Sequence, residues 1–159
     1  MSEALRNLNE NLKEQVEIYH ETLNLEELKQ KALIKNDLQE IESITAREEA
    51  MIIKVNRLEK QRLLWAEQIG LELGRVPEDL TLAELVENFP VLEDVRLDLD
   101  RVVERLQEIH TINSQLLQQA MKIVDYTVGL LTHQESNTYT APSKRENEEK
   151  KRQLMDWRV

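Results

Sequence analysis

Apolar residues recur at intervals of three or four along three long stretches of this chain, and few residues in those stretches interrupt a helix. Such spacing places the apolar side chains on one face of an α-helix. Proline and glycine each occur at only three of the 159 positions. Strand-rich and loop-rich folds need turn residues about every ten positions. The pattern therefore predicts an all-α protein.

The first two long helices are expected over residues 3–34 and 38–69, separated by a tight hairpin at 35–37. Asn36 tolerates the left-handed conformation that ends helices, and Asp37 is a favourable cap for the next helix. Gly70 and Gly74 are expected to end the second helix. Without this hairpin, one helix about 100 Å long would need a partner along its whole length.

A connector and a longer third helix complete the predicted domain. Thr81 and Glu84 form the pattern of a capping box, so a short helix is expected over 81–88. The third long helix is expected over 91–134, and the polar Asn113 interrupts its heptad-like stripe. We predict one domain over 1–134: an elongated antiparallel three-helix coiled-coil-like bundle with a short connector helix. The mostly polar residues 135–159 are expected to form a mobile C-terminal tail.

The charge of the chain limits its partners. The formal net charge is −10, and the acidic excess is largest over residues 71–108. Nucleic acids and anionic membrane surfaces are unfavourable partners for so acidic a chain. The sequence shows neither a signal-peptide pattern nor an apolar run long enough to span a membrane. With cysteine absent, these features predict a cytoplasmic protein with no nucleic-acid partner and no membrane insertion.

Sequence motifs for catalysis are absent. Glu17 and His20 have the Glu-x-x-His spacing of carboxylate-bridged metal sites, but such sites need a second motif, and neither His110 nor His133 supplies it. No phosphate-binding loop or nucleophile turn is present. We therefore expect no catalytic residues, no metal, no cofactor and no enzymatic activity.

A second apolar stripe lies beside the first in residues 110–134, where Lys122 and Asp125 are the only strong charges. A helix in a small bundle needs only one apolar face. The extra face has three interpretations: more core in a tightly wrapped bundle, a surface for a partner helix, or a homodimer contact. Because the third helix is longer than the other two, part of it is expected to extend beyond them. The second stripe consists of Leu117, Met121, Val124, Val128 and Leu131.

Three segments of the chain resemble the FlgN family of flagellar export chaperones. The segments are residues 32–62, 80–90 and 112–131, and the resemblance covers about residues 5–140. The residues that carry it in the first segment are Ala32, Leu33, Asp37, Ile41, Glu48, Leu58, Glu59 and Arg62.

The resemblance implies a cytosolic chaperone that binds the terminal helices of hook-associated (hook–filament junction) flagellar proteins. Such a chaperone prevents premature assembly and delivers its clients to the type III export gate. It also implies that Tyr139 in the tail docks at the export gate, and we expect a monomer or weak dimer. A structural coiled-coil adaptor or homodimer is the alternative. By position, the implied client-binding residues are Leu116, Leu117, Ala120, Met121, Ile123, Val124, Val128 and Leu131.

Overall fold

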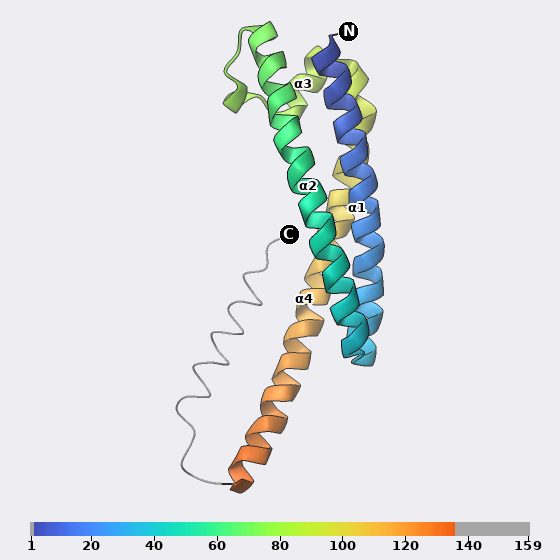
Figure 1. Cartoon of the computed structure of the whole chain (residues 1–159), viewed down its shortest axis with the longest axis vertical. Helices are drawn as coiled ribbons and strands as arrows, with labels where there is room; N and C mark the ends of the chain where they lie inside the picture. The colour runs from blue at the N-terminus through green and yellow to red at the C-terminus, as the bar shows by residue number, and fades with distance from the viewer. Residues whose placement is uncertain (1, 136–159) are drawn as a thin grey trace.

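The structure is a computed structural model that describes residues 2–135, and this range is helical with no strand. The first two helices form a hairpin, the connector crosses one end of it, and the last helix returns parallel to the first (Figure 1). The predicted all-α bundle is thereby confirmed. Its elements are α1 (Glu3–Lys35), α2 (Leu38–Leu73), η1 (Pro77–Asp79), α3 (Leu82–Asn88), η2 (Pro90–Leu92) and α4 (Glu93–Glu135).

The hairpin between α1 and α2 forms at the residues that predicted it. Asn36 adopts a left-handed conformation, with φ of 55°, and its N–H bonds the last carbonyls of α1. The Asp37 carboxylate accepts a hydrogen bond from the Glu40 N–H at 3.2 Å, which caps α2. These two residues, hereafter the hairpin tip, therefore end one helix and begin the next.

The predicted ends of two helices were wrong by a few residues. α2 ends at Leu73 rather than at residue 69, and only Gly74 adopts the left-handed conformation, with φ of 66°. Gly70 stays helical and is buried beside Ile69, since the helical cost of one glycine is only about 1 kcal/mol. α4 begins at Glu93 rather than at residue 91, because Pro90–Leu92 form a separate 3-10 turn.

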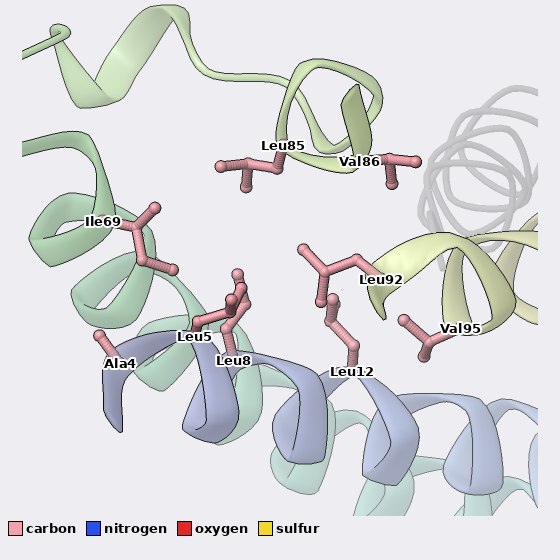
Figure 2. Close-up of a cluster of buried hydrophobic side chains, with 9 residues drawn as sticks. All are labelled: Ala4, Leu5, Leu8, Leu12, Ile69, Leu85, Val86, Leu92 and Val95. Carbon is pink, nitrogen blue, oxygen red and sulfur yellow. The ribbon is translucent and has the colours of Figure 1, made fainter. Parts of the chain in front are cut away.

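The main apolar core lies at the connector end of the rod, where all four α-helices meet. Figure 2 shows side chains of α1, Ile69 of α2 and the connector residues Leu85 and Leu92 directed into one space. The Thr81–Glu84 capping box fixes the start of α3 as predicted, and Trp65 packs against this core. A smaller core beside the hairpin tip contains Leu25, Ala32 and Ile44.

Candidate partner-binding surface

The contact between α1 and α4 fixes how far α4 extends beyond the hairpin. The Asn113 Nδ2 donates to the backbone oxygen of Glu26 at 2.8 Å and to its Oε2 at 2.7 Å. A residue of α4 at this level is therefore numbered 87 higher than the α1 residue beside it. Because the helices run parallel, the same offset places Asn36 level with Ile123. Residues 123–135, about 20 Å of helix, therefore lie past the hairpin tip (Figure 1). We call them the α4 extension.

The predicted client-binding residues divide into two groups along α4. Leu116, Leu117, Ala120 and Met121 are half-buried, because they lie level with the last turns of the hairpin. The remaining predicted residues lie on the α4 extension and are exposed, as are Tyr126 and Leu130 beside them. Both apolar stripes are therefore uncovered there within the described residues. The exposed fractions are 64% for Ile123, 60% for Val124, 45% for Val128 and 62% for Leu131.

The remaining sequence-predicted features lie elsewhere. Glu17 and His20 are both exposed on α1. No group of three or more His, Asp or Glu side chains that could hold a metal ion occurs in residues 2–135. Tyr139 and the rest of the predicted tail after residue 135 lie outside the described residues.

Sequence reasoning did not predict a buried group of ionisable side chains at the level of Asn113. Glu26 and Glu48 are each only 3% exposed. The Lys29 Nζ lies 3.3 Å from Glu48 Oε2 and 4.0 Å from Glu26 Oε1. Glu26, Lys29, Glu48 and Asn113, hereafter the polar cluster, connect all three long helices ten residues before α4 passes the hairpin tip. The available signal was the charged Glu48 within the apolar stripe of α2.

The pKa of Glu48 is raised from 4.5 to about 7. Burial is the main cause, since it disfavours the charged carboxylate. A side-chain hydrogen bond with Glu26 and the negative charge of Glu26 act in the same direction, while the ammonium of Lys29 opposes them. The two carboxyl groups thus share one cation, and Glu48 holds its proton to near-neutral pH.

A groove of about 320 Å³ lies between α1, α2, α3 and α4, closer to the connector than the polar cluster is. Leu12 and Leu99 line it, but so do Glu59, Arg62 and other charged or amide side chains. The pKa of Tyr19 in this groove is raised by burial and by the charge of Glu59, against the effect of Arg62. A groove with so many charged groups suits an apolar helix face less well than the α4 extension does.

A substitution at Gly129 tests the stability of the helix in the α4 extension. Apart from the adjoining backbone of α4 itself, no atom lies within 4 Å of a Cβ added at this position, so Gly129→Ala is expected to stabilise the local helix by about 1 kcal/mol. Slower amide hydrogen exchange over residues 125–135 would report this gain. Gly74→Ala is the control with the opposite sign, because the φ of Gly74 is +66° and a side chain there is strained. Unchanged exchange in Gly129→Ala would contradict a stable helix in the extension.

The architecture defines a class of protein: a helical rod with one uncovered apolar end, suited to binding other helices. No helix in the described part is both long and apolar enough to cross a membrane. The model of the FlgN family, described as FlgN protein, matches residues 1–147. The chain therefore belongs to the FlgN family and is a flagellar export chaperone. Searches of curated proteins and of solved structures found no match to this chain.

Proposed function

We propose that this chain is a cytoplasmic chaperone that holds the terminal amphipathic helices of hook-associated flagellar proteins on the α4 extension and the half-buried turns before it. Bound there, the client helices are kept from assembling prematurely until export. The observation that carries the proposal is the uncovered apolar surface at the end of α4. The named client class comes from the resemblance of residues 32–62, 80–90 and 112–131 to the FlgN family.

The energy of such a contact comes from the apolar surface that it buries. Fully burying five exposed apolar side chains contributes roughly 7–15 kcal/mol before costs, and the second stripe contributes less because Leu117 and Met121 are already half-buried. Ordering a client segment costs about 2–5 kcal/mol or more, and association adds a further loss of translational and rotational freedom. Binding therefore also requires the apolar side chains of the client, which are buried in the same contact. Lys122 and Asp125 are the only strongly charged residues between positions 110 and 134, so clients of different charge are tolerated.

We predict that Tyr139 takes part in delivering the client to the export gate. Tyr139→Ala is expected to reduce secretion of the client while leaving its binding to the chaperone unchanged, because position 139 follows the end of the proposed client surface. Secretion and co-purification of a hook-associated protein, measured in parallel, separate the two effects. Loss of co-purification in this variant would contradict the assigned role.

Val124→Asp tests the client surface directly. The aspartate places a charge in the middle of the contact, and we expect client affinity to fall at least about 100-fold, equivalent to about 2.7 kcal/mol. The measurement is titration calorimetry against purified hook-associated proteins encoded in the same genome. Met121→Asp should have the same effect, with some additional loss of stability because Met121 is half-buried.

Gln118→Asp is the matched control, since Gln118 is exposed on the polar side of the same helix. Gln118→Asp should bind the client with an affinity close to that of the unsubstituted chain. Both Gln118→Asp and Val124→Asp should keep a thermal melting temperature close to that of the unsubstituted chain. Unchanged client binding in Val124→Asp would exclude the proposed surface. A tight dimer that Val124→Asp dissociates, with no client affinity, would favour the homodimer instead.

A further inference from the structure

The apolar surface of the α4 extension is wider than one helix contact requires. At about 100° per residue, the apolar positions of the extension, from Tyr126 through Ile123 and Val124 to Val128, cover about 200° of the helix circumference. The rest of the circumference carries polar residues such as Lys122. A helix that packs on one neighbour needs an apolar stripe only about 100° wide.

The part of α4 that packs against the hairpin shows how wide an arc of side chains such a contact takes up. Against the hairpin, the inward residues of α4 from Val95 to Asn113 lie within about 80° of the circumference. Val95, Val102 and Leu106 in this arc are buried. The apolar arc of the extension is therefore more than twice as wide as the arc of α4 that contacts the hairpin. Before the extension, the apolar positions outside that contact arc, Leu97, Val103 and Ile112, are likewise exposed.

The extension also continues an existing helix interface. Its apolar residues follow directly after the half-buried turns that contact the end of the hairpin. Ile34 and Leu38, which flank the hairpin tip, are 67% and 73% exposed. These two exposed apolar side chains lie close to the level at which the extension begins.

From this geometry we infer that the α4 extension binds two client helices side by side, which together continue the bundle beyond the hairpin tip. This inference rests on the proposed chaperone function and adds the number and arrangement of the client helices. Each helix needs an amphipathic stretch of about 13 residues to cover the 20 Å extension. One helix packs on the side of Leu130 and the other on the side of Val128.

The test uses substitutions on the two sides of the apolar arc. Leu130 and Val128 are both exposed and lie about 160° apart around the helix, so one client helix cannot cover both. We expect Leu130→Asp and Val128→Asp each to weaken binding of a full-length hook-associated protein at least 10-fold. Gln118→Asp should leave binding within 2-fold of the unsubstituted chain. Circular dichroism melting checks that the Leu130 and Val128 variants remain folded.

Peptides of the client's amino-terminal and carboxyl-terminal helices, titrated separately, give a second readout. Each peptide is expected to lose affinity with one of the two substitutions, Leu130→Asp or Val128→Asp, and to keep it with the other. If only one of the two substitutions weakens binding of the full-length client, a single helix is bound and the inference is wrong, while the chaperone function stands. If Val124→Asp also leaves binding unchanged, the proposed function itself fails. Client-independent dimerisation abolished by both Leu130→Asp and Val128→Asp would assign the surface to a second copy and overturn the inference.

Discussion

Lys29→Met is expected to lower the free energy of unfolding by about 3 kcal/mol or more at pH 8. Methionine keeps the length and apolar stem of the side chain but removes the only cation of the polar cluster. Glu26 and Glu48, both buried, are then left as carboxyl groups without an ion-pair partner. Because breaking a buried pair leaves an uncompensated charge, the loss exceeds that for an exposed pair. Urea unfolding followed by circular dichroism measures the effect.

Lys31→Met is the control for this prediction, since Lys31 is exposed two residues further along α1. Its effect should stay within about 0.5 kcal/mol. The loss in Lys29→Met should also be smaller near pH 5, where Glu48, with its pKa of about 7, is neutral and needs no cation. A loss at pH 8 no larger than that of Lys31→Met would show that Lys29 does not compensate these carboxylates.

Most of the fold could be predicted because it depends on local signals. Asn36 and Asp37 ended and began helices through their own conformational preferences, and Thr81 and Glu84 formed their capping box within one turn. Gly70 misled the prediction, because a glycine ends a helix only where the chain must adopt a positive φ. That requirement falls at Gly74, where the cap closes on the carbonyls of Gly70 and Leu71, and the sequence pattern presented both glycines alike.

The apolar end of α4 could also be predicted, since two stripes and an excess of helix length are both visible in the sequence. What the sequence could not show is where the hairpin stops covering α4. That position depends on the contact of Asn113 with Glu26 across 87 residues. Leu116 and Ala120 lie before it and are half-buried, whereas Ile123 lies beyond it and is exposed.

The buried polar groups were the least predictable part. Asn11 donates to the backbone oxygen of Leu58 at 3.0 Å and accepts from Gln15 at 2.9 Å, well inside the bundle. Such residues interrupt an apolar stripe in the sequence, and the interruption suggests a position where the helices pack loosely. Their partners come from other helices or other turns, so their burial becomes visible only once the helices are placed together.

The polar cluster has a consequence for the client surface. Glu26 accepts two hydrogen bonds from Asn113, and these bonds specify one alignment of α4 on α1. A shift of α4 by one turn toward the connector would bury part of the extension and unpair this cluster. A buried polar contact of this kind selects register rather than adding stability. The polar cluster thus fixes how much apolar helix extends beyond the hairpin, where we propose that the client binds.

Glu48→Gln is expected to remove a pH dependence from the stability of the protein and to stabilise it above neutral pH. The folded-state pKa of Glu48, about 7, lies above its ordinary value of 4.5. Between these values the folded protein holds more protons than the unfolded chain, so stability falls as pH rises. At about 1.4 kcal/mol per pKa unit, the contribution present below pH 4.5 and lost above pH 7 amounts to about 3 kcal/mol.

Glutamine keeps the size and hydrogen-bonding groups of the neutral carboxyl group but cannot ionise. The unsubstituted chain and Glu48→Gln should therefore have similar unfolding free energies at pH 4.5, while at pH 8 the variant is more stable by up to about 3 kcal/mol. Glu49→Gln, at an exposed position one residue along α2, controls for the change in net charge and should show no such divergence. Parallel stability curves for Glu48→Gln and the unsubstituted chain from pH 4.5 to pH 8 would mean that Glu48 is ionised across this range, with Lys29 outweighing the cost of burial.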